Sequence, residues 1–138
     1  MQNLKRTITW VLLIFIAAAV VTIFRPREAV LLPDGLCVLF WHSETRCAPC
    51  RHMEEMIHNV LGDRKDYRLF NLEYDVLAYQ SLAQEFNVGT ITLILVERKD
   101  RKNVRVRDLT IEIQETAADD AAFAEMFQRE LKQFREGQ

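Results

Sequence analysis

The chain has 138 residues, enough for one domain, and 49% of them are hydrophobic, which supplies material for a buried core. Its 18 basic and 20 acidic residues give a net charge of −2. Residues 1–27 hold four of the basic residues and none of the acidic ones, so the remainder has a net charge of −6. This balance does not favour nucleic acid as a partner.

An apolar segment without formal charge runs from Ile8 to Phe24, with basic residues on both sides. Its seventeen residues would span about 26 Å as a helix, at the short end for crossing a bilayer. We predict that residues 1–27 form an uncleaved N-terminal membrane anchor, a single transmembrane helix. The alternative is a cleaved signal peptide, because residues 17–19 are all alanine, but the apolar run continues beyond them.

Residues 28–35 are predicted to be a spacer that ends in the turn Pro33-Asp34-Gly35. The following run from Leu36 to Trp41 is almost continuously apolar, which is typical of a strand buried on both faces. Cys37 lies inside this run. We interpret it as a small buried hydrophobic residue rather than as a redox partner.

Two cysteines three positions apart follow the strand, in the sequence Cys47-Ala48-Pro49-Cys50. If a helix starts at Cys47, its unpaired N–H groups and Arg46 should stabilise a thiolate there and lower the pKa of Cys47. Pro49 fits a first helical turn, because its missing N–H would have no partner there. Disulfide exchange needs such a pair, since one thiol attacks and the other resolves the mixed disulfide.

Three other interpretations of the pair are half of a zinc site, an inert structural disulfide and the relic of a lost activity. Zinc normally has four ligands, and neither a second C-x-x-C nor an H-x-x-x-H motif occurs in the sequence. His42, His52 and His58 would complete a zinc site only if the fold brought them together. A disulfide across two intervening residues closes so small a loop that it constrains little.

The segment after the cysteines alternates helical and strand patterns. Apolar residues recur at helical spacing from Cys50 onward, and Gly62 ends this run. Alternating and β-branched segments predict the next three elements: a strand over 67–74, a short helix over 77–86 and a central strand over 90–97.

The last part of the chain predicts a hairpin and a helix. A polar turn over 100–103 is followed by an alternating segment, 104–114, which we predict to be an edge strand. The residues 116–119 resemble a capping box for a final helix. Apolar residues on one face of that helix should pack in the core: Phe123, Phe127, Leu131 and Phe134.

The strand Leu36–Trp41, the loop, the cysteine pair and Met53 together resemble the active-site strand, loop and helix of the thioredoxin superfamily. The resemblance extends from about Leu36 to Phe134, although only the cysteine stretch is specific. With the element order βαβα-ββα, it implies an α/β thioredoxin-like fold, a mixed central sheet flanked by helices. We expect this domain to cover residues 36–138.

The resemblance implies a thiol–disulfide oxidoreductase that acts on protein thiols or disulfides and needs no cofactor or metal. Cys47 would be the nucleophile and Cys50 the resolving thiol. An extended substrate segment would dock on the backbone around Thr90 and Ile91, with Trp41 also contributing to substrate binding. A tethered domain of this type usually faces the periplasm or another extracytoplasmic space, where disulfide chemistry is permitted.

The sequence departs from the family pattern at three positions. Leu39 stands where the family commonly has a buried acid that relays a proton for the second cysteine, so His42 and Glu44 are the candidates for that role. Arg46 replaces the tryptophan that usually precedes the first cysteine. Ile91 replaces the family's cis-proline, and we expect a trans bond there, because a cis bond before a non-proline residue costs about 2.5–4 kcal/mol.

Two alternative functions follow from these departures. One is a thioredoxin-like binding module in which Cys47 and Cys50 hold a metal ion or an iron–sulfur centre, with His42 or a second protomer contributing ligands. The other is a non-catalytic interaction domain. Turnover of a model disulfide separates the oxidoreductase from both alternatives.

Overall fold

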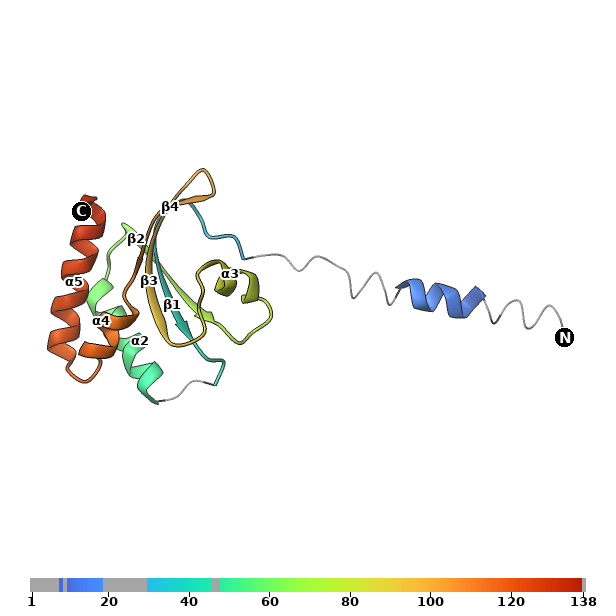
Figure 1. Ribbon diagram of the computed structural model, residues 1–138, viewed down its shortest axis with the longest axis horizontal. Helices are drawn as coiled ribbons and strands as arrows, with labels where there is room; N and C mark the ends of the chain where they lie inside the picture. The colour runs from blue at the N-terminus through green and yellow to red at the C-terminus, as the bar shows by residue number, and fades with distance from the viewer. Residues whose placement is uncertain (1–7, 9, 19–29, 46–47, 138) are drawn as a thin grey trace.

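The computed structural model describes residues 8, 10–18, 30–45 and 48–137 (Figure 1). Arg46 and Cys47, and most of the predicted anchor, therefore lie outside the described residues. The elements of the folded domain follow in chain order: β1 (Gly35–His42), α2 (Ala48–Leu61), β2 (Tyr67–Glu73), α3 (Gln80–Glu85), β3 (Thr92–Lys99), β4 (Lys102–Asp108), α4 (Thr110–Thr116) and α5 (Asp120–Glu136).

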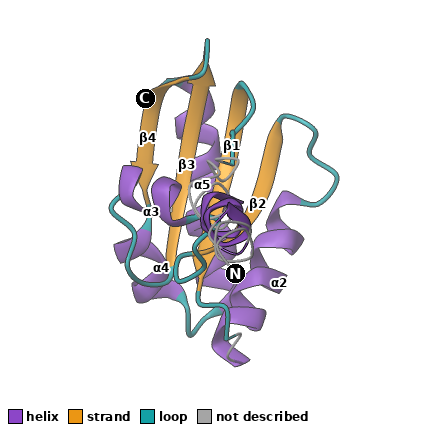
Figure 2. Cartoon of the chain, turned by 90° about the vertical axis from the view of Figure 1, so that its right-hand side faces the viewer, coloured by secondary structure: helices purple, strands orange, loops and turns teal. Residues whose placement is uncertain are grey.

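Four strands form one mixed sheet in the order β2-β1-β3-β4. β1 pairs in parallel with β2 and antiparallel with β3, and β3 pairs antiparallel with β4. Helices α2, α4 and α5 cover one face of the sheet and α3 covers the other (Figures 1 and 2). The predicted α/β class and the mixed sheet flanked by helices are thus confirmed.

The central strand β1 contributes to a separate core on each face, because successive side chains of a strand point to opposite sides. Val38 and Phe40 pack in the core beneath α2 and α5. Cys37, Leu39 and Trp41 pack in the core beneath α3. All five side chains are fully buried, as the continuous apolar run predicted.

The apolar face predicted for the last helix also lies in the core of the α2 side. Its four predicted members are buried: Phe123, Phe127, Leu131 and Phe134. The helix α5 ends at Glu136 and is capped by Gly137, whose φ of 79° lies in the left-handed region that glycine adopts easily.

The predicted edge strand over 104–114 is wrong in its second half. β4 ends at Asp108, and the helix α4 begins at Thr110. The Asp108 carboxylate accepts hydrogen bonds from the Thr110 backbone N–H (2.8 Å) and hydroxyl (2.5 Å), so it satisfies donors at the helix start. Ile113 then points into the core instead of continuing a strand.

The predicted capping box over 116–119 is also wrong. Thr116 is the last residue of α4, and its hydroxyl donates to the carbonyl of Glu112 at 2.7 Å. Asp119 alone caps α5, because its carboxylate accepts from the backbone N–H groups of Ala121 and Ala122 at 2.9 and 3.0 Å.

The ends of several elements differ from the predicted ranges. Helix α3 starts at Gln80 rather than at residue 77, and β3 starts at Thr92, which leaves Thr90 and Ile91 outside the sheet. The predicted polar turn is confirmed as the tip of the β3–β4 hairpin. The Asp34 carboxylate accepts from both backbone N–H groups of that tip, at Asp100 (3.1 Å) and Arg101 (3.0 Å).

Residues 10–18 are helical, and their large apolar side chains are exposed, with Trp10 at 61% and Phe15 at 77%. Within the described part of the chain, no helix is long and apolar enough to cross a membrane. Both limits of the predicted anchor, residues 1 and 27, lie outside the described residues, as does the last of the three alanines of the alternative cleavage site.

Candidate active site

Helix α2 starts at Ala48, the residue that follows Cys47 in the sequence. Cys50 therefore lies in the first turn of the helix, and its side chain is only 4% exposed. It is the first member of the buried face of α2, which continues through Met53, Met56 and Ile57. The second thiol of the pair is thus held on the inner side of the helix start.

The N-terminus of α2 carries no compensating negative charge in its first turn. The first backbone N–H groups of a helix have no partner within it and carry partial positive charge. An anionic sulfur placed at this helix start would be stabilised.

An aspartate from another loop holds the segment that leads to the cysteine motif. Asp75 follows β2, and its carboxylate accepts from the Ser43 hydroxyl at 2.5 Å and from the Glu44 backbone N–H at 2.7 Å. These two bonds, chiefly the one from Ser43, hold the pKa of the Asp75 carboxyl below its ordinary value. Sequence analysis missed Asp75.

Only the pairing of β1 with β2 shows that Asp75 lies near the cysteine motif. β1 and β2 run in parallel with His42 opposite Glu73, so the residues that follow the two strands meet at one edge of the sheet. An acid placed just after the neighbouring parallel strand can reach the loop after β1. Local sequence pattern does not contain that pairing.

His42 ends β1 and is buried, with 1% exposure. Its ring lies 5.6 Å from that of Phe40, which places it on the α2 side of the sheet. Nδ1 lies 2.7 Å from the carbonyl oxygen of Ser43, which can only accept, so Nδ1 carries the proton. Nε2 is then an acceptor, and it is buried without a hydrogen-bond partner among the described residues.

The other candidate for a proton relay, Glu44, is exposed on the loop. Leu39, which stands at the position of the family's buried acid, is fully buried in the apolar core beneath α3. The structure therefore leaves His42 as the only buried polar candidate of the three in the described part of the site.

An apolar groove of about 420 Å³ lies beside the cysteine motif. Two of the predicted substrate-binding residues, Thr90 and Ile91, line it together with Pro49. Met53 and Met56 contribute from α2, and the remaining lining residues come from α2 and from the α4 region: His52, Ile113, Gln114 and Ala117.

Trp41 does not lie in this groove. Its side chain is fully buried in the core beneath α3, so it offers no surface to a substrate in this conformation. Its indole Nε1 is buried without a hydrogen-bond partner among the described residues. Trp41 supports β1 from the face opposite α2.

No group of three or more His, Cys, Asp or Glu side chains within the described residues is placed to hold a metal ion. The histidines proposed as ligands have other positions. His42 is buried, and His52 makes a 2.8 Å contact with Asp120 at the start of α5. His58 is exposed in the last turn of α2.

Cys37 lies apart from the site, inside β1. It is fully buried, and burial raises the pKa of its thiol, with Arg68 and Arg98 opposing the shift. Its sulfur donates to the carbonyl oxygen of Pro33 at 3.7 Å. This environment keeps Cys37 a protonated core residue at neutral pH.

Solved structures of several thioredoxins are similar to this chain. Deadhead, the germline-specific thioredoxin of Drosophila melanogaster, is 17% identical, with a TM-score of 0.47 over 70% of this chain and 81% of that one. Mitochondrial thioredoxin 3 of Saccharomyces cerevisiae is 18% identical, with a TM-score of 0.43 over 65% of this chain and 83% of that one. Trxlp of Edwardsiella tarda EIB202 is 21% identical, with a TM-score of 0.41 over 54% and 70%.

The mixed sheet with helices on both faces is the thioredoxin-like arrangement that the sequence resemblance implied. No protein-family model matches the chain, and no curated protein matches it. The chemistry of the site therefore rests on the residues of this chain.

Proposed function

We propose that the protein is a thiol–disulfide oxidoreductase in which Cys47 and Cys50 alternate between a dithiol and a disulfide. The observation that carries this proposal is the start of α2. The helix begins directly after Cys47 in the sequence and holds Cys50 on its inner side, in the first turn. Disulfide exchange requires one thiol that attacks and a second that resolves the mixed disulfide, and we give these roles to Cys47 and Cys50 respectively.

In the reducing direction, the Cys47 thiolate attacks one sulfur of a substrate disulfide. A bond forms between Cys47 and that sulfur, and the other substrate sulfur leaves as a thiolate that takes up a proton. The Cys50 thiolate then attacks Cys47, which forms the Cys47–Cys50 disulfide and releases the second substrate thiol. Two electrons and two protons pass to the substrate, and the oxidising direction is the reverse of these steps.

Two features would lower the pKa of Cys47 in this mechanism. The partial positive charge at the N-terminus of α2 favours an anion, and Arg46 precedes Cys47 in the sequence. We assign Arg46 the role of stabilising the thiolate. Its charge takes the place of the aromatic residue found at this position in the thioredoxin family.

Cys50 must lose its proton before it attacks, and we assign His42 as the proton acceptor. His42 closes the strand that leads into the motif and lies on the face of the sheet that α2 covers. Its Nε2 is buried and without a partner among the described residues, so it is available to accept a proton. Leu39 cannot perform this function because its side chain is aliphatic.

The substrates would be protein thiols or disulfides. Thr90 and Ile91 lie outside β3 and line the groove next to Pro49, so an extended segment could dock there by backbone hydrogen bonds. Residues 1–27 would anchor the domain in a membrane and hold it on the extracytoplasmic side, such as the periplasm. The exposed apolar side chains of the helical residues 10–18 support the anchor.

Trapping of the mixed disulfide tests the proposal. The full chain in detergent, carrying Cys50→Ser, should accumulate a covalent adduct with a peptide disulfide, and peptide mapping should locate it at Cys47. The matched variant Cys47→Ser should trap far less. Equal trapping by both variants, or none by either, would show that the pair does not work in these roles.

A further inference from the structure

Charged side chains are distributed unevenly between the two ends of the sheet. β1 and β2 end, and β3 begins, at the edge where α2 starts, and α4 follows the end of β4 there. The exposed side chains at this edge include several acids: Glu44, Asp75, Glu115, Asp119 and Asp120. Exposed bases are fewer among the described residues of this edge, Arg51 and Arg107. We call this edge, which holds the start of α2, the acidic end.

The lysines of the folded domain gather toward the opposite end. This end holds the start of β1, the loop between α2 and β2, the tip of the β3–β4 hairpin and the end of α5. The lysines among residues 30–45 and 48–137 lie on these last three elements: Lys65, Lys99, Lys102 and Lys132. Figure 1 shows the hairpin tip and the segment that enters β1 together, at the end of the sheet opposite the start of α2.

The hairpin tip is held in one conformation by the segment that enters β1. Asp100 and Arg101 have φ angles of 53° and 62°, as a two-residue hairpin turn requires. The Asp34 carboxylate accepts from the backbone N–H groups of both residues. Arg98 is 8% exposed, and its guanidinium donates to the Arg101 carbonyl and to the Asn103 side chain, each at 2.8 Å. The tip is therefore fixed to the part of the chain that follows the proposed anchor.

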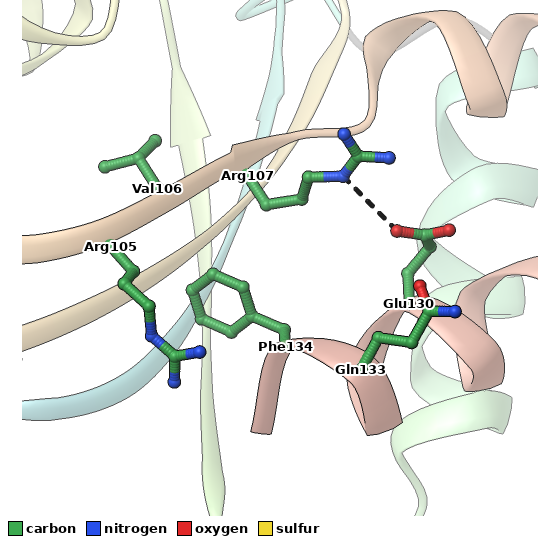
Figure 3. Close-up of a pocket in the computed structure, with 6 residues that line it drawn as sticks. All are labelled: Arg105, Val106, Arg107, Glu130, Gln133 and Phe134. Carbon is green, nitrogen blue, oxygen red and sulfur yellow. Dashed lines mark hydrogen bonds and ion pairs between the residues drawn. The ribbon is translucent and has the colours of Figure 1, made fainter. Parts of the chain in front are cut away.

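Three exposed cations of the tip have no ion-pair partner among the described residues: Lys99, Arg101 and Lys102. We call these three the basic tip. The arginines further along β4 are already paired. Arg105 contacts Glu97 at 2.6 Å, and Arg107 contacts Glu130 of α5 at 3.3 Å, as Figure 3 shows. Within residues 98–103, Asp100 is the one acid that offsets the basic tip.

Two observations indicate which partner fits the basic tip. Leu31, three residues before Asp34, is 75% exposed, whereas the next residue, Leu32, is 4% exposed and lies in the core. An exposed apolar side chain beside free cations is the composition that binds a membrane interface. The second observation is the short tether, because the seven steps from residue 27 to Asp34 span at most about 25 Å. An anchor in residues 1–27 would keep the basic tip close to the headgroups.

We infer that the basic tip, together with Leu31, is a contact surface for anionic lipid headgroups, and that this contact directs the cysteine motif away from the membrane. A negative surface attracts the basic tip and repels the acidic end when that end turns toward it, so both ends favour the same orientation. Each Lys or Arg near such a surface raises the population in contact about fivefold. The inference rests on the proposed membrane anchor and is independent of the redox reaction.

Hydroxyl-radical footprinting of the full chain tests the contact with an uncharged reporter. The chain would be placed in nanodiscs of phosphatidylcholine, with and without phosphatidylglycerol, and mass spectrometry would measure oxidation of Leu31. Ile111 of α4, which is 69% exposed near the acidic end, is the matched control. Phosphatidylglycerol should lower the oxidation of Leu31 at least about threefold, and high salt should restore it, whereas Ile111 should not change. Equal oxidation of Leu31 in the two lipids, or protection of Ile111 instead, would overturn the inference.

Charge-matched variants then test the basic tip itself. The double variant Lys99→Gln with Lys102→Gln should lower the population in contact on the order of thirtyfold and remove the protection of Leu31. The double variant Arg51→Gln with Arg129→Gln loses the same net charge away from the tip and should keep the protection. Protection that survives in the lysine variant would overturn the inference. An equal loss in both variants would also overturn it, because net charge rather than the tip would then be responsible.

Turnover in detergent separates this inference from the proposed redox function. The lysine variant should reduce a small disulfide at the original rate, because the basic tip and the start of α2 lie at opposite ends of the sheet. Protection of Leu31 without any turnover would refute the oxidoreductase function and leave the lipid contact supported. Turnover without lipid-dependent protection would refute the contact and leave the redox function supported. A chain that does not remain with the nanodiscs would refute both the anchor and the contact.

Discussion

Replacing His42 by phenylalanine should make the domain more stable and its disulfide exchange slower. The ring is 1% exposed, with one hydrogen bond at Nδ1 and a buried Nε2 that has no partner among the described residues. An unpaired buried polar group costs about 1–3 kcal/mol, and the lost hydrogen bond contributed about 0.5–1.5 kcal/mol. The net gain in His42→Phe is then about 1 kcal/mol, since an aromatic ring still packs against Phe40.

The same change removes the proposed proton acceptor for Cys50. General-base catalysis contributes about 10²-fold or more, so the resolving step should slow by about that factor. A stable mixed disulfide between Cys47 and a small thiol isolates this step, because its loss reports attack by Cys50 alone. Urea unfolding gives the free energy of unfolding of the same variant.

The exposed residue Glu44 provides the matched control. Glu44→Gln should change neither the stability nor the resolving rate. A more stable His42→Phe that resolves at the original rate would show that His42 has only a packing role. A slow step in Glu44→Gln would move the proton relay to the loop.

Three further changes test the site. Arg46→Gln should raise the pKa of Cys47 and slow its alkylation near pH 7, and an unchanged pH profile would mean that the helix terminus alone stabilises the thiolate. Cys37 should be alkylated only after denaturation, because it is fully buried and burial raises its pKa; mass spectrometry showing label in the folded protein would contradict this. Asp75→Asn should loosen the loop before the motif and slow exchange at neutral pH. The pKa of Asp75 is lowered, so its charge should order the loop at pH values above about 3.9, the ordinary pKa of an aspartate. This ordering should be lost as the pH falls through the lower pKa of the folded state. Exchange that is insensitive to Asp75→Asn would refute the role of Asp75.

Much of the fold was predictable because its signals are local. The continuous apolar run of β1 and the helical spacing after Cys50 each indicate one element, and Gly62 ends α2 with a φ of 50° that suits glycine. The apolar face of α5 was predictable for the same reason. Each of these patterns matches only one type of structure.

The α4 region was not predictable in this way. Its apolar residues, Ile111 and Ile113, repeat the two-residue spacing of Val104 and Val106, although the alternation shifts by one residue between the two pairs, so each half of the segment resembles a strand. In the fold, the Asp108 carboxylate accepts from the Thr110 backbone N–H at the start of α4, and burial of Ile113 stabilises the helix. A hydrogen bond and a tertiary contact of this kind are weak signals in a single sequence.

The candidate site was predictable only in part. The spacing of Cys47 and Cys50 is recognisable in the sequence alone. The segment before β3, where Ile91 stands in place of the family's cis-proline, pointed to Thr90 and Ile91, and both residues line the groove. Asp75 contacts Ser43, a residue far away in the sequence. This contact depends on the pairing of β1 with β2, so it emerges only from the fold.

A redox titration tests the central claim most directly. The full chain would be equilibrated in buffers of defined glutathione potential, its free thiols alkylated, and the modified cysteines identified by mass spectrometry. The account predicts one reversible two-electron transition in which Cys47 and Cys50 lose their label together while Cys37 is unchanged. A pair that stays reduced across the range, or a transition that leaves glutathione on a single cysteine, would contradict it.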